Sequence, residues 1–173
     1  DVGSFVSSTG GTVIATGTAV TVGGNVTGQT NVNLTGTNGD VQVTGNVASV
    51  AGLVSLSAQQ AGSVLVSGDV TAAQNVNVST TTGTGGGLID IGGVVTSTTG
   101  SVQVQADDTV TVDGDLSAQT AVTVSTQTGA ITLGGNVASN TTSVAIISNQ
   151  SSSVGVASGI HVFFFNDTAT TEN

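Results

Sequence analysis

The sequence predicts an all-β protein wound as a parallel β-helix, and three observations lead to this prediction. Apolar residues, mostly valine, alternate with polar residues in short runs, which is the period-two pattern of half-buried strands. These runs recur about every 21 to 23 residues along the 173-residue chain. Glycine followed by asparagine, aspartate or a second glycine returns at the same place in each repeat.

Each repeat contains three short apolar elements, which we expect to be strands. One series consists of the pairs Val32/Leu34, Val54/Leu56, Val76/Val78, Val102/Val104, Val122/Val124 and Val144/Ile146. A second series consists of Val20/Val22, Val41/Val43, Val64/Val66, Ile89/Ile91, Val110/Val112, Ile131/Leu133 and Val154/Val156. A third element follows each second pair and reads Gly24-Asn25-Val26, Gly45-Asn46-Val47, Gly68-Asp69-Val70, Gly92-Gly93-Val94, Gly114-Asp115-Leu116 and Gly135-Asn136-Val137.

A three-strand unit of this size cannot bury its apolar side alone, but it can do so when it stacks on copies of itself. We therefore expect about six to seven coils over residues 1–160, in which each strand pairs with its equivalent one coil away. Glycine, asparagine and aspartate tolerate the backbone of a sharp corner. The predicted structural corner positions are Asn25, Asn46, Asp69, Gly93, Asp115 and Asn136. The longest insertion, Thr80 to Gly87, should bulge from one corner.

The composition excludes several classes of function. The chain has no Lys, Arg or Cys, one His, and ten acidic residues, which give a formal charge of −10. A nucleic-acid binder needs cations for phosphate, and no apolar run is long enough to span a membrane. Polysaccharide-cleaving enzymes combine paired carboxylates with aromatic and cationic groups, and Trp, Tyr, Lys and Arg are all absent. We therefore expect a protein that is not an enzyme and that carries no cofactor.

Four aspartates, Asp107, Asp108, Asp113 and Asp115, fall close together and form the one weak candidate for a metal site. Carboxylate oxygens are the ligands of Ca²⁺, which makes calcium the candidate ion. The EF-hand spacing and the glycine-rich repeat of calcium-binding β-rolls are both missing. The sequence Asp-Gly-Asp is also ordinary turn chemistry, so solvated carboxylates at a corner are the main expectation.

The segments NVNLTGTNGDVQVTGNVAS (31–49) and AVTVSTQTGAITLGGNVAS (121–139) resemble the repeats of filamentous-haemagglutinin-like proteins. These are large secreted bacterial adhesins, many of them exported by two-partner secretion. The resemblance covers roughly positions 10 to 160. It implies a right-handed β-helix, an extracellular or bacterial cell-surface location, and a role in adhesion or as a stalk. The secretion domain of the family is not recognisable in this chain.

The tail at 161–173 differs in kind, because it holds the only His, the only Glu and three of the four Phe. Its sequence NDTATTE (166–172) resembles the translation of a widely used short-read sequencing adapter. One interpretation is that the tail from about Phe163 derives from such an adapter and that the true protein continues. The alternative is an aromatic cap on the last coil.

Two functions agree with these observations. The first is a structural shaft or stalk segment of a secreted or cell-surface adhesin, whose partner would be a host or matrix surface ligand bound by the full-length protein. The second is a self-assembling extracellular filament subunit, whose partners would be copies of itself joined end to end through open strand edges. Neither function involves nucleic acid or membrane insertion.

Overall fold

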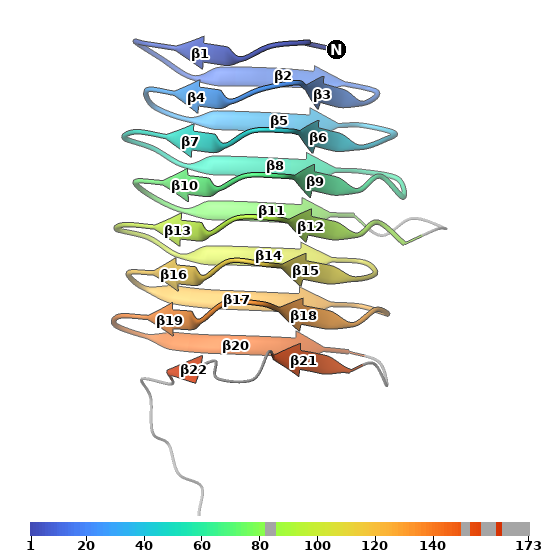
Figure 1. Cartoon of the computed structure of the whole chain (residues 1–173), viewed down its shortest axis with the longest axis vertical. Helices are drawn as coiled ribbons and strands as arrows, with labels where there is room; N and C mark the ends of the chain where they lie inside the picture. Colours follow the sequence, from blue (N-terminus) through green and yellow to red (C-terminus); the bar gives the residue numbers. More distant parts are fainter. Residues whose placement is uncertain (82–85, 150–152, 157–161, 164–173) are drawn as a thin grey trace, which may run out of the picture.

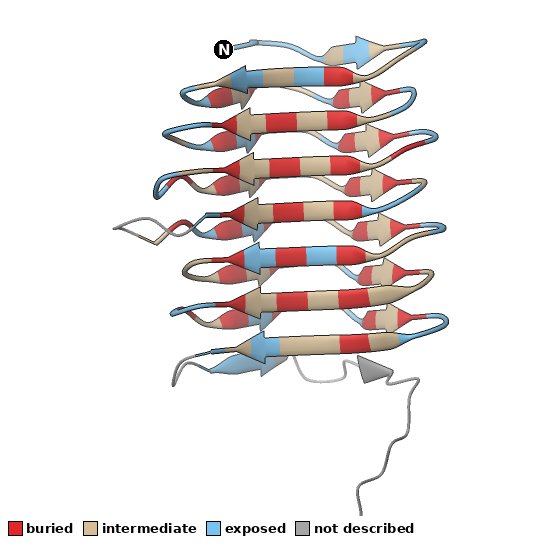
Figure 2. Ribbon diagram, turned by 180° about the vertical axis from the view of Figure 1, so that it is seen from behind, coloured by how far each residue is buried: buried red, intermediate tan, exposed pale blue. Residues whose placement is uncertain are grey.

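The computed structural model describes residues 1–81, 86–149, 153–156 and 162–163. It confirms the all-β prediction: the described chain is a β-solenoid of stacked coils with three strands per coil (Figure 1). Seen from the N-terminal end, the chain turns clockwise as it recedes, so the solenoid is right-handed (Figures 1 and 2). This is the usual hand for parallel crossovers between L-amino-acid strands.

The strands form three parallel sheets, which we call A, B and C. Sheet A contains β3 (Val20–Val22), β6 (Val41–Val43), β9 (Val64–Val66), β12 (Ile89–Ile91), β15 (Val110–Val112), β18 (Ile131–Leu133) and β21 (Val154–Val156). Sheet B contains β1 (Val6–Ser8), β4 (Val26–Gly28), β7 (Val47–Ser49), β10 (Val70–Ala72), β13 (Val95–Ser97), β16 (Leu116–Ala118), β19 (Val137–Ser139) and β22 (Val162–Phe163). Sheet C contains β2 (Val13–Gly17), β5 (Val32–Gly36), β8 (Val54–Ala58), β11 (Val76–Thr80), β14 (Val102–Ala106), β17 (Ala121–Thr126) and β20 (Ser143–Ser148).

The pairing is in register throughout, so each apolar residue lies on its equivalent in the next coil. Val32 pairs with Val54, for example, and Val54 pairs with Val76. The inward residues of the central coils are fully buried, and the strands alternate buried and more exposed residues (Figure 2). Each buried valine or leucine contributes about 1.5 to 3 kcal/mol of transfer free energy. The core is thus one continuous column of β-branched and leucine side chains.

The three corners differ in how much their length varies. Between sheets A and B, the corner has three residues in every coil from β3–β4 to β18–β19, as in 23–25, 44–46 and 67–69. Between sheets C and A, the corner ranges from residues 18–19 to the long connection after β11, part of which (82–85) lies outside the described residues. The predicted bulge at Thr80 to Gly87 lies at this C–A corner. Its described ends are joined, because Thr80 Oγ1 donates to the Gly87 carbonyl at 2.9 Å.

One predicted strand is shifted by a residue. The pattern Gly92-Gly93-Val94 suggested that the strand begins at Val94, but β13 begins at Val95. Val95 pairs with Val70 on one side and with Leu116 on the other. Two glycines followed by two valines fit either register locally, and the stacking with the neighbouring coils decides between them.

Of the predicted tail 161–173, the structure describes only the backbone pairing of β22 with β19. His161 and residues 164–173, including the adapter-like segment, lie outside the described residues. No helix in the described ranges is long and apolar enough to cross a membrane.

Candidate functional site

The A–B corner carries a column of asparagine and aspartate side chains, which one coil interrupts. The Asn46 N–H donates to Asn25 Oδ1 at 2.9 Å, and the Asp69 N–H donates to Asn46 Oδ1 at 2.9 Å. Further along, the Val94 N–H donates to Asp69 Oδ1 and the Asn136 N–H to Asp115 Oδ1. Four of the coil interfaces are therefore joined at this corner by a side chain that accepts a backbone hydrogen bond. We call this row of residues the Asx column.

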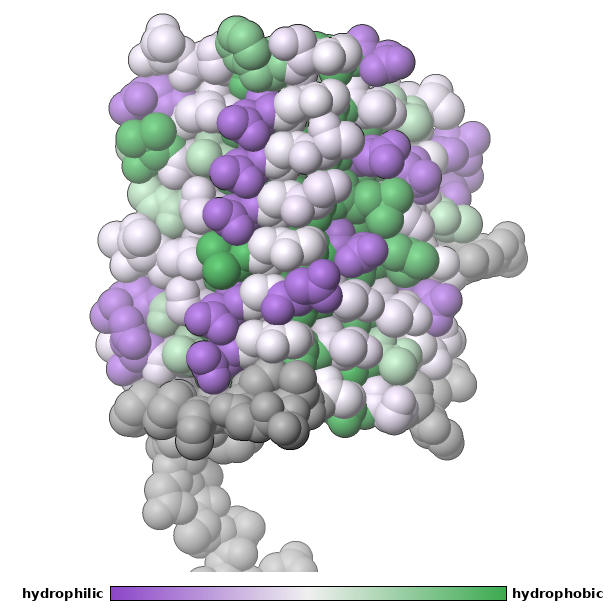
Figure 3. All heavy atoms as spheres, in the orientation of Figure 1, coloured by the Kyte–Doolittle hydropathy of each residue, from purple (hydrophilic) through white to green (hydrophobic). Residues whose placement is uncertain are grey.

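The register places Val94, and not Gly93, in the Asx column. Gly93 belongs to a neighbouring column of glycines that includes Gly45 and Gly68. A Cβ atom added at Gly68 would lie 2.2 Å from Asn46 Oδ1, so only glycine fits beside the accepting side chain. Figure 3 shows the Asx column as a line of hydrophilic side chains that one hydrophobic side chain interrupts. Val94 offers no acceptor to the amide of Asp115, and the column is therefore divided.

The B–C corner shows a regularity that the sequence analysis missed. Between the last residue of each sheet B strand and the first inward valine of sheet C lies a turn. This turn has four residues in one coil and three in the next, alternately along the solenoid. We call them long turns (9–12, 50–53, 98–101 and 140–143) and short turns (29–31, 73–75 and 119–121). The strand before each long turn ends in Ser8, Ser49, Ser97 or Ser139, and the strand before each short turn ends in Gly28, Ala72 or Ala118.

The serine hydroxyl bridges the long turn to the short turn of the coil before it. Ser49 Oγ donates to the Thr30 carbonyl at 2.6 Å and accepts the Gly52 N–H at 3.1 Å. Ser97 Oγ repeats both bonds with Gln74 and Gly100, at 2.5 and 3.0 Å. Ser139 Oγ donates in the same way to the carbonyl of Thr120, the middle residue of the short turn one coil earlier. The tetrapeptide Ser-x-x-Gly is the sequence signal of the first three long turns, and the fourth has Thr142 in place of the glycine.

The four aspartates proposed for calcium divide between two corners. Asp107 and Asp108 follow β14 at the C–A corner, whereas Asp113 and Asp115 flank the A–B corner after β15. Within the described part of the chain, no three acidic, histidine or cysteine side chains come close enough together to hold a metal ion. Asp115 is instead an acceptor in the Asx column.

The negative charge of the described chain lies on one side of the solenoid. Its aspartates are on sheet A or at the two corners that flank this sheet: Asp1, Asp40, Asp69, Asp90, Asp107, Asp108, Asp113 and Asp115. The outward residues of sheets B and C are mainly serine, threonine, asparagine and glutamine. Sheet A also carries a shallow hollow of about 380 Å³, lined in part by Leu65, Asp90 and Asp113. The rod therefore has an acidic side and an uncharged side.

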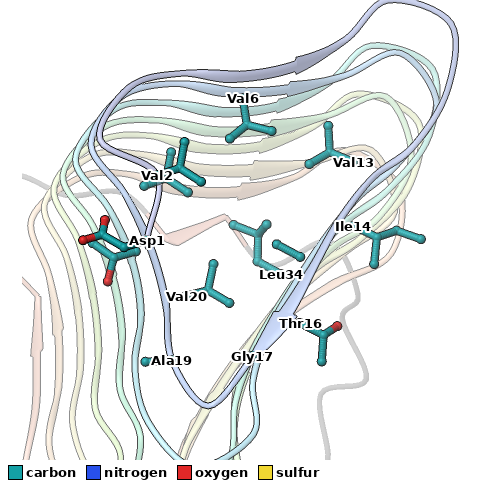
Figure 4. A pocket seen from close by; sticks show the side chains of 13 residues that line it. Asp1, Val2, Val6, Val13, Ile14, Thr16, Gly17, Ala19, Val20 and Leu34 are labelled. Carbon is teal, nitrogen blue, oxygen red and sulfur yellow. The ribbon is translucent and has the colours of Figure 1, made fainter.

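The N-terminal end of the solenoid is open. A hollow of about 480 Å³ there is lined by inward side chains that include Val2, Val6, Val13, Val20 and Leu34 (Figure 4). The first residues cover it only in part, because Val2 forms a single parallel bridge with Val22. The outer edges of β1 and β2 have no strand beside them among the described residues.

A scan of the chain against protein-family models finds no match, and searches of the curated proteins and of the solved structures find no match either.

Proposed function

We propose that these coils are a structural shaft segment of a secreted or cell-surface adhesin, and that their role is mechanical and not catalytic. The observation that carries the proposal is the continuity of all three sheets across every described coil, with equivalent residues in register. Three sheets around one apolar core resist bending, because any bend must stretch a ladder of backbone hydrogen bonds on one side. The resemblance to the haemagglutinin-like repeats supports the adhesin and its extracellular location.

The surface of the coils agrees with a shaft that does not itself bind other molecules. The uncharged sides are covered by short polar side chains, and the acidic side repels anionic surfaces. In this proposal, contact with a host or matrix ligand is made by other parts of the full-length protein.

Single-molecule force spectroscopy tests the mechanical part of the proposal. With handles at both termini, we expect a shaft to unfold in repeated steps, each releasing one coil. A coil of about 22 residues should add about 7 nm of extended chain. Unfolding at negligible force, without coil-sized steps, would argue against a load-bearing shaft.

A binding assay tests whether these coils leave ligand binding to other parts of the full-length protein. The chain is passed over immobilised glycans, matrix proteins and host cells, with a β-solenoid of comparable charge as the control. We expect no saturable binding beyond that of the control. Saturable binding that substitutions on one face of the solenoid abolish would make these coils the adhesive part itself.

The open N-terminal end favours a second candidate, the self-assembling filament subunit. Unpaired strand edges over an apolar hollow invite the addition of another chain. Sedimentation velocity over a wide range of protein concentration separates the two candidates. A filament subunit should form species that lengthen with concentration, whereas a shaft segment should sediment as a monomer.

A further inference from the structure

The open N-terminal end contains a hydroxyl group whose usual acceptor belongs to another coil. Ser8 accepts the Gly11 N–H at 3.1 Å, as Ser49 and Ser97 accept the amides of their own long turns. Ser49 and Ser97 also donate to the middle carbonyl of a short turn in the coil before them. Ser8 has no such carbonyl among the described residues, because β1 is the first strand of sheet B.

We propose that the N-terminal end is a docking surface for a solenoid coil of the short-turn type. The coil would add one strand beside β1 and one beside β2, and its inward side chains would fill the hollow above Leu34. The middle carbonyl of its short turn would accept the hydrogen bond from Ser8. This inference rests on the proposed function only in that both require further coils of the same kind.

Three features of the surface select this occupant. β1 and β2 pair in parallel and in register with β4 and β5, so a strand that continues these ladders in the same register is parallel. The hollow is lined by valine and leucine side chains, which fit the inward residues of another coil. The coil that carries Ser8 has a long turn, and every long turn with a described predecessor follows a short one.

A second copy cannot dock through its own coil of β19 and β20, because β22 already pairs with the outer edge of β19.

The test fuses one extra coil to the N-terminus of the full chain. Residues 114–131 supply a short-turn coil, and residues 93–110 supply a long-turn coil of equal length as the matched control. Each segment ends at the first residue of a sheet A strand. In the fusion, Asp1 and Val2 supply the second and third residues of this strand. Urea denaturation and amide exchange in β2 are measured for both fusions and for the unfused chain, each with and without Ser8→Ala.

We expect the short-turn fusion to raise the denaturation midpoint and to slow amide exchange in β2 more than the long-turn fusion does. Ser8→Ala should lower the midpoint of the short-turn fusion by more than it lowers that of the unfused chain, since only the fusion supplies the carbonyl. Equal effects of Ser8→Ala in the two proteins, or equal stabilisation by both fusions, would overturn the proposal.

A second copy as occupant is an outcome of the same experiment. If the unfused chain forms oligomers that the short-turn fusion fails to suppress, the end does not select a short-turn coil and the proposal is wrong. These results are independent of the force measurement. If Ser8→Ala destabilises the short-turn fusion more than the unfused chain, but the chain unfolds at negligible force, the docking surface is supported and the shaft is contradicted.

Discussion

At the scale of single residues, two kinds of side chain supply the hydrogen bonds that the corner backbone lacks. In four coils, the Asx column gives an acceptor to the amide that follows the A–B corner glycine. At the B–C corner, a serine hydroxyl compensates for the additional residue of the long turn. Both devices act between coils, and each therefore adds stability to an interface and not to a single coil.

Repair of the Asx column should stabilise the protein. Val94→Asn places an acceptor beside the amide of Asp115, in the geometry that Asn25 and Asn46 already show. We expect a gain of about 0.5 to 1.5 kcal/mol in the free energy of unfolding, measured by urea denaturation. The control is Val50→Asn, which removes an exposed valine outside the column and should have little effect. A loss of stability in Val94→Asn would mean that the valine makes a packing contribution larger than the missing bond.

Removal of a bridging serine should destabilise the protein. Ser49→Ala leaves the Gly52 amide and the Thr30 carbonyl without their shared hydroxyl in a site that is only 4% exposed. We expect a loss of about 1 to 3 kcal/mol, seen as a lower denaturation midpoint. Ser55→Ala in the same coil faces outward from β8 and should change stability by no more than about 0.5 kcal/mol. Equal effects of the two substitutions would show that water replaces the hydroxyl.

At the scale of elements, the sequence predicts most strands well, because those of sheets A and C are largely valine-rich pairs with period two and most of those of sheet B begin with a valine or leucine after the corner. It also predicts the A–B corner, where the length is constant from β3–β4 to β18–β19 and the same residue types return. It does not predict the register at Val94 and Val95, where the choice depends on contacts with Val70 and Leu116. It also conceals the two-coil alternation, because Ser-x-x-Gly does not stand out in a chain rich in serine and glycine.

The difference between constant and variable corners predicts where insertions are tolerated. Four residues of glycine and serine inserted between Gln60 and Ala61, at the C–A corner, should cost no more than about 1 kcal/mol. Both residues have positive φ angles (51° and 67°) in an irregular turn. The same insertion between Gly68 and Asp69 displaces Asp69 from its bonds to Asn46 and Val94 and should cost about 2 kcal/mol or more. Thermal denaturation of the two variants measures the difference, and equal costs would contradict it.

At the scale of the whole molecule, the chain carries ten acidic residues and neither Lys nor Arg. Its charges repel one another, and the described aspartates are concentrated around sheet A. Unlike most proteins, it has no lysine or arginine ion pairs that salt would weaken. Electrostatic screening by salt should therefore only stabilise the protein, because it weakens the repulsion between carboxylates.

We expect sodium chloride to raise the thermal denaturation midpoint steadily between about 0.01 M and about 0.15 M, as the screening length falls to about 8 Å. Calcium chloride at matched ionic strength is the comparison. Because the four candidate aspartates divide between two corners, calcium should add little beyond its ionic strength. A larger calcium shift that Asp113→Asn abolishes would instead reveal a specific site.

The one-sided charge gives the rod a preferred roll about its own long axis. Near a negatively charged wall, a rod with its carboxylates along one side experiences a torque that turns this side towards the solvent. The uncharged B–C corner then faces the wall. An array of such coils would thus be oriented around its axis as well as along it, without any specific contact.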